Sequence, residues 1–197
     1  MTGRDPVPYG WWLASRASGI DALGLVTVAV AAGLALGGRI SRRPGAAARL
    51  RALHEHAALV ALATRAIHAL TLLGDRWLHP GLAGIAIPFH MPYRPLATGT
   101  GIIAGYLAAA LGLSYYARRR IGTQRWRRLH RLTIVVYAMG VAHALTAGTD
   151  GGSAVIRVAV LATAVPIAGL YAWRVRAGRR RARRARRAVP ARTPARA

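Results

Sequence analysis

The chain has 197 residues, of which 54% are hydrophobic and only 17% are charged, and its formal net charge is +24. All 29 basic residues are Arg, and only five residues are acidic. A soluble domain of this size has about a quarter charged residues, with both signs mixed, so this composition favours a membrane protein. The absence of Cys excludes thiolate metal sites, disulfides, iron–sulfur clusters and covalently attached c-type haem.

Five apolar runs are long enough to cross a bilayer, which takes about 20 residues. They cover residues 17–38, 53–74, 96–117, 129–148 and 153–173. The sequence therefore predicts an all-α integral membrane protein in which five transmembrane helices form a bundle. We divide the chain into an outer N-terminal segment (1–16), a membrane domain (17–173) and a basic, disordered cytoplasmic tail (174–197).

Arginine is distributed unevenly between the connecting segments. Residues 39–51, residues 118–131 and the tail hold five, seven and eleven Arg, whereas the N-terminus and the other two connections hold five in all. The positive-inside rule then places the N-terminus outside and the C-terminus in the cytoplasm. With the Arg, Ala, Gly and Pro richness typical of high-GC coding, this predicts a multi-pass protein of a bacterial cell membrane. We expect the basic tail to bind anionic lipid rather than nucleic acid.

Residues 75–95 connect the second and third spans on the predicted outer side. They contain four Pro, which forbid a continuous helix. The apolar run 82–87 is too short to span a bilayer, so we expect a cap over the outer mouth of the bundle. In the third span, Gly101 and Gly105 form a GxxxG motif, which permits close packing of helices and by itself indicates nothing more.

Four of the seven histidines lie in two spans at matching depths. His54 and His68 are 14 residues apart in the second span, and His130 and His143 are 13 apart in the fourth. Both spans enter from the cytoplasmic side, so an inner layer (His54, His130) and an outer layer (His68, His143) lie about 20 Å apart. Two imidazoles per layer can ligate the iron of one haem, so we expect two stacked, six-coordinate haem b groups.

Helical angles fit this arrangement better in the second span than in the fourth. At about 100° per residue, the second-span pair lies within about 40° of one face, whereas the steps from His130 to His143 add up to about 220°. A tightened turn in the fourth span, for example near Gly140, is therefore required. His56 lies about 200° from His54, and we expect it to be structural or to face lipid.

Two arginines are candidates for contact with the haems. Arg65 lies on the face of His54 and one turn below His68, in mid-bilayer, where an unpaired Arg is costly. We expect it to balance the charge of a haem propionate or to tune the haem potentials, the alternative being hydrogen bonds to carbonyls or to Thr64. Arg16, at the outer end of the first span, is a candidate for the outer haem, and interfacial snorkelling is an equal alternative.

The histidine spacing resembles that of the ferric reductase-like transmembrane domain, a superfamily that includes NADPH oxidases, ferric reductases and the haem-binding subunit of the periplasmic methionine sulfoxide reductase system. Further similarity lies in residues 16–19, 79–81, 92–95 and 125–130, and the resemblance covers about residues 11–173. Many members have six spans, whereas this chain has five. The resemblance implies a di-haem b cytochrome that relays electrons across the membrane.

No flavin or nicotinamide domain follows the fifth span, so we expect FAD or FMN only on a partner protein. The predicted donor is a cytoplasmic flavin reductase or a quinol, and the predicted acceptor is an extracytoplasmic one such as ferric iron or a flavoprotein. The chain would then be an oxidoreductase component. Two alternatives remain open: a non-catalytic, haem-bearing anchor subunit of a reductase complex, and a small proton or anion transporter.

Overall fold

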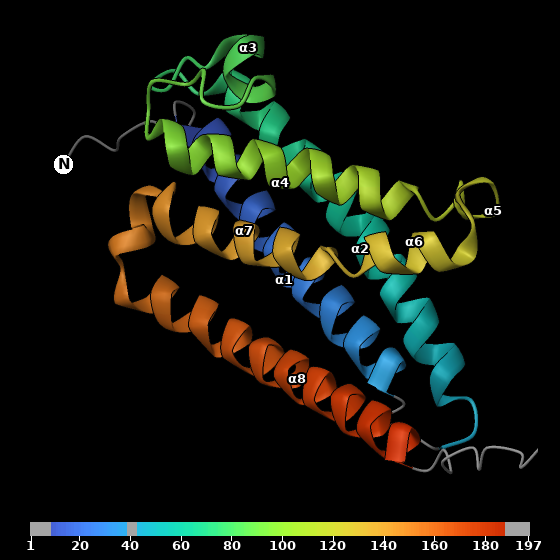
Figure 1. Cartoon of the computed structure of the whole chain (residues 1–197). Helices are drawn as coiled ribbons and strands as arrows, with labels where there is room; N and C mark the ends of the chain where they lie inside the picture. Colours follow the sequence, from blue (N-terminus) through green and yellow to red (C-terminus); the bar gives the residue numbers. More distant parts are fainter. Residues whose placement is uncertain (1–8, 39–42, 188–197) are drawn as a thin grey trace, which may run out of the picture.

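The computed structural model describes residues 9–38 and 43–187. These residues are predominantly helical and form no strand. Within these described ranges, five segments are long and apolar enough to cross a membrane, which confirms the five candidate spans predicted from the sequence. They are α1 (Gly10–Gly38), α2 (Ala46–Thr71), α4 (Pro95–Leu113), the consecutive helices α6 (Thr123–His130) and α7 (Thr133–Thr146), and α8 (Ala154–Arg187), shown in Figure 1.

The helices form a bundle in which consecutive spans run in opposite directions (Figure 1). Helix α1 packs along α2, α4 packs along α7, and α8 packs against α1 and α7. Short helices connect the spans: η2 (Leu72–Gly74), α3 (Gly81–Ala86), α5 (Arg118–Ile121) and η3 (Thr149–Gly152). In Figure 1, α3 and η3 lie at the end of the bundle where α1 begins, and α5 lies at the opposite end.

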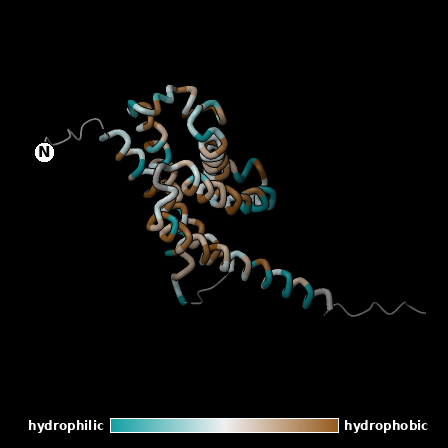
Figure 2. Tube along the Cα trace, turned by 90° about the vertical axis from the view of Figure 1, so that its left-hand side faces the viewer, coloured by the Kyte–Doolittle hydropathy of each residue, from teal (hydrophilic) through white to brown (hydrophobic). Residues whose placement is uncertain are grey.

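The bundle has a small buried core and a large apolar surface. Leu34, Tyr137 and Ile167 bring α1, α7 and α8 together in the core. By contrast, Leu96 and Val155 are each 76% exposed. Figure 2 shows hydrophobic residues along the middle of the helices and hydrophilic ones toward the end of α8. Such exposed apolar surface is stable when a lipid bilayer covers it, so the structure fits a multi-pass membrane protein.

Both ends of the membrane domain extend beyond the predicted boundaries. Helix α1 begins at Gly10, so part of the predicted outer segment 1–16 is helical. Helix α8 is 34 residues long and continues to Arg187, where disorder was expected from Arg174 onward. Arg and Ala are strong helix formers, and a span that is already helical needs no new nucleation, so the helix continues past the bilayer. Residues 1–8 and 188–197 lie outside the described residues.

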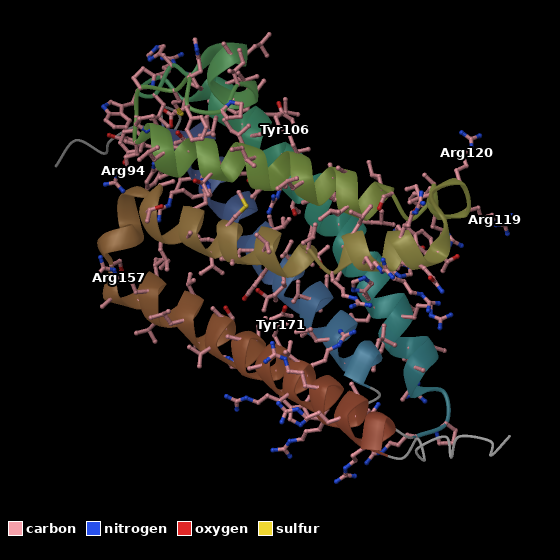
Figure 3. All side chains as sticks on the ribbon, in the orientation of Figure 1. Arg94, Tyr106, Arg119, Arg120, Arg157 and Tyr171 are labelled. Carbon is pink, nitrogen blue, oxygen red and sulfur yellow. The ribbon has the colours of Figure 1, made fainter. Side chains whose placement is uncertain are left out.

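The connection 75–95 contains the short α3, as its Pro content predicted, and hydrogen bonds attach it to the bundle. Asp75 accepts two backbone N–H bonds from the turn that follows it, at 2.8 and 3.1 Å. The Tyr106 hydroxyl of α4 donates to the last carbonyl of α3 at 2.6 Å. Arg94 Nη1 donates to the carbonyl of Thr146 (2.7 Å), the last residue of α7, and to that of Gly148 (3.1 Å) just after it, and Figure 3 shows Arg94 at this end of the bundle. The connection is thereby tied to α4 and α7.

Candidate functional site

The structure brings the four predicted histidines together as two pairs. The imidazole centres of His54 and His130 lie 5.9 Å apart, and their ring planes are 84° apart. Those of His68 and His143 lie 6.2 Å apart, with planes at 80°. The first pair joins α2 to α6, and the second joins α2 to α7. These are the two pairs that parallel spans and matching depth predicted.

Three of the four rings are held by a hydrogen bond from Nδ1 to a backbone carbonyl of a neighbouring helix. The bonds run from His54 to Ala29 at 2.7 Å, from His68 to Ser15 at 2.7 Å and from His143 to Ala97 at 2.9 Å. A carbonyl can only accept, so Nδ1 carries the hydrogen in each of these rings. The lone pair then lies on Nε2, which is the nitrogen left to bind a metal.

The same three rings rest against glycines, and each glycine lies four residues after the carbonyl that its ring contacts. Gly33 lies beside His54, Gly19 beside His68 and Gly101 beside His143. In an α-helix the carbonyl of residue i points toward residue i+4, so a missing side chain at i+4 leaves that carbonyl accessible from the side. We call this combination, a carbonyl at i and a Gly at i+4, a histidine seat.

His130 has no histidine seat. It is the last residue of α6, and its Nδ1 is buried and makes no hydrogen bond within the described part of the chain. The Leu111 carbonyl of α4 lies within reach of the ring, but no well-formed hydrogen bond joins it to Nδ1. Instead the ring stacks on Trp126, one turn earlier in α6, with centres 5.0 Å apart and planes at 26°.

A break between α6 and α7 supplies the tightened turn that the fourth span requires. It lies at Arg131 and Leu132, not near Gly140 as expected. Three backbone bonds in this region, from Leu132, Ile134 and Val135, span three residues instead of four. Each such step turns the chain by about 120° instead of 100°, which reduces the mismatch between the two histidines by about 60°.

Arg65 lies between the two histidine layers of α2, and its side chain is half-buried. Its Nη1 atom is buried and has no hydrogen-bond partner among the described residues. Thr64, one alternative partner, donates to carbonyls of its own helix. A Cβ on Gly105 would lie 3.6 Å from Arg65 Cδ, and one on Gly140 would lie 3.9 Å from Nη2. The GxxxG motif thus does more than pack helices: Gly101 seats a histidine and Gly105 makes room for this arginine.

The two remaining predictions concern Arg16 in α1 and His56 in α2. The Arg16 guanidinium lies 4.5 Å from the centre of the Trp12 ring, a cation–π contact within α1. This contact is compatible with interfacial snorkelling, and a role of Arg16 at the outer haem stays a prediction. His56 donates to the carbonyl of Ala52 at 2.7 Å and remains exposed, away from both pairs.

The ring separation within each pair equals the one that two imidazoles on opposite sides of a single iron would have. A metal lies about 2 Å from a coordinating ring nitrogen, which is roughly 1.1 Å from its ring centre, so two imidazoles on opposite sides of one iron have centres about 6 Å apart. The measured 5.9 and 6.2 Å match this separation. No group of three or more His, Cys, Asp or Glu in the described part of the chain can hold a bare metal ion. A porphyrin would supply the other four ligands of its iron, so a haem would need only two histidines from the protein.

The histidine seats were not predicted, although the sequence contained a signal for two of them. Gly19 and Gly33 are separated by 14 residues, as are His54 and His68, and α1 runs antiparallel to α2. No known protein family matches the chain, and no solved structure matches it. The resemblance to the ferric reductase-like domain therefore rests on the histidine spacing and the short sequence segments alone.

Proposed function

We propose that this chain is a di-haem b membrane cytochrome that relays electrons between the two sides of a bacterial cell membrane. The observation that supports it best is the presence of two imidazole pairs, stacked along one bundle, each with the ring separation that one iron requires. Three of the four rings also have the tautomer that leaves Nε2 for the metal. Haem supplies the one-electron chemistry when bound, and the protein supplies ligation, spacing and electrostatics.

The residues of the site have separate tasks in this proposal. His54 and His130 hold the inner haem, and His68 and His143 hold the outer one. A hydrogen bond from Nδ1 to a carbonyl orients the ring and increases the basicity of Nε2, which strengthens the bond to iron. Arg65 places a positive charge between the layers, where a haem propionate is a suitable counter-ion and where the charge favours the reduced state of the haems.

The proposed direction of transfer follows from the distribution of Arg. The segments rich in Arg mark the cytoplasmic side, so electrons enter at the inner pair and leave from the outer pair. The donor is a cytoplasmic flavin reductase carrying FAD or FMN, or a quinol. The acceptor lies outside the membrane, with ferric iron or a flavoprotein as candidates, in line with the resemblance to ferric reductase-like proteins.

Reconstituted vesicles test this proposal. A flavin reductase with NADPH, or a quinol, is supplied on the side of the Arg-rich segments, and membrane-impermeant ferricyanide is enclosed on the other. We expect ferricyanide reduction with the wild type and with His56→Ala, the matched control on the same helix, and loss of reduction with His54→Ala. Undiminished reduction with His54→Ala would contradict the relay, and bound haem without any transfer would favour the anchor-subunit alternative.

A further inference from the structure

His130 is attached to the protein differently from the other three histidines. His54, His68 and His143 each lie within a continuous helix and each occupy a histidine seat. His130 is the last residue of α6, next to the break at residues 131–132, and no glycine beside its ring is found among the described glycines. The backbone that carries it is therefore less constrained than the backbone that carries the other three.

The absence of a hydrogen bond from His130 Nδ1 to a carbonyl has a direct consequence for His130 as a metal ligand. A hydrogen bond from Nδ1 to a carbonyl favours the bonded orientation of the ring over other orientations by about two- to tenfold. It also raises the basicity of Nε2, the nitrogen that binds the metal. His130 lacks this contribution, and its partner His54 has it. The inner pair thus combines one firmly held ligand with one weakly held ligand, whereas both ligands of the outer pair are firmly held.

Aromatic rings are what keep His130 in place. Trp126 stacks on it, and Tyr115 meets Trp126 edge-on with centres 5.8 Å apart. Arg118 lies 3.8 Å above the Tyr115 ring, and Tyr116, 63% exposed, meets Tyr115 at 5.5 Å. These rings connect His130 to the surface near α5, and Figure 3 shows the α5 residues Arg119 and Arg120 extending from this end of the bundle.

From these contrasts we infer that His130 is an exchangeable ligand, so that the inner site binds small neutral π-acceptor ligands such as carbon monoxide while the outer site stays closed to them. The inference rests on the proposed function, because it requires haem in both pairs. In the exchange, the bond from the ferrous iron to His130 Nε2 breaks and a bond to the incoming ligand forms, with no change in oxidation state. His54 remains bound on the opposite side.

Carbon monoxide added to the dithionite-reduced, full-length protein tests this inference. Haem content is measured first, because wild type without haem contradicts the proposed function itself. With two haems present, we expect one carbon monoxide bound per two haems. The variant His54→Ala/His130→Ala, which retains only the outer pair, should bind none, and His68→Ala/His143→Ala should bind one per haem. Binding at neither site, at both sites or at the outer site alone would overturn the inference while leaving the proposed function intact.

The role of the stack is tested by the rate of carbon monoxide binding. Without the stack on Trp126, the His130 ring should be held in its ligating position about two- to tenfold less strongly. Trp126→Ala should therefore accelerate carbon monoxide binding by that factor. Trp126→Phe keeps a ring and should stay close to wild type. Trp173→Ala, on α8, is the matched control and should leave the rate unchanged. The wild-type stoichiometry and the single variants are measured without the double variants. The inference can therefore be refuted even if the double variants do not fold.

Discussion

Replacing the glycines of α1 by Ala gives a sharp test of the histidine seats, because the same helix offers a control. A Cβ on Gly19 would lie 2.9 Å from His68 Nδ1, closer than side chains tolerate, so the ring has to move. A Cβ on Gly33 would lie 3.2 Å from the His54 ring, which needs a shift of only a few tenths of an ångström. Gly24 lies between them and has no atom within 4 Å of an added Cβ.

The expected effects follow this order. Overpacking of this kind costs about 1–3 kcal/mol, and displacing His68 also endangers a hydrogen bond with a net value of about 0.5–1.5 kcal/mol. Gly19→Ala should therefore weaken retention of the outer haem by about 5- to 150-fold. Gly33→Ala should affect the inner haem near the lower end of that range. Gly24→Ala should change neither haem, and it should stabilise α1 by about 0.5–1 kcal/mol because Gly is a poor helix former.

The assay is the number of haems per purified chain after washing with apomyoglobin, a haem acceptor, together with a redox titration that separates the two sites. The reasoning is refuted if Gly24→Ala loses as much haem as Gly19→Ala. It is refuted equally if Gly19→Ala retains both haems with unchanged spectra and potentials, since the ring of His68 would then not depend on its seat.

Three other substitutions have defined outcomes. His68→Ala and His143→Ala should each remove the outer haem and keep the inner one, whereas His56→Ala should keep both, as measured by the pyridine haemochrome; unchanged haem after either outer substitution would mean that the layers are assigned wrongly. Arg65→Met should lower the potential of at least one haem, because a positive charge favours the reduced form, and potentiometric titration showing no shift would contradict a role between the layers. Arg94→Met should lower the free energy of unfolding by about 1 kcal/mol through loss of its bonds to the carbonyls of Thr146 and Gly148 at the end of α7, measured in detergent as a lower Tm with unchanged haem spectra; an unchanged Tm would show that these bonds add no stability.

The spans and the histidine pairs could be predicted because both depend on strong, periodic signals. Long apolar runs locate the helices, and the alternation of Arg-rich connections makes the second and fourth spans parallel. Once they are parallel, His54 must lie at the depth of His130 and His68 at that of His143. Hydropathy and helix rise therefore determine the candidate site to within about a helical turn.

The details of ligand attachment could not be derived in the same way. Every residue carries a backbone carbonyl, so nothing in the sequence identifies Ser15 or Ala97 as the acceptor until the register of neighbouring helices is known. Neither Gly nor Pro marks the break at Arg131 and Leu132, and so the tightened turn was expected at Gly140 instead. The helical continuation of α8 past Arg174 was missed because its positive charge was taken as a sign of disorder.

The central claim is that each histidine pair ligates one haem, and the haem content of the purified wild-type chain tests it most directly. A pyridine haemochrome measurement with protein quantified by amino-acid analysis should give two haems b per chain, both low-spin in the optical spectrum of the untreated protein. A colourless protein, obtained from cells that supply haem to other membrane cytochromes, would contradict the claim.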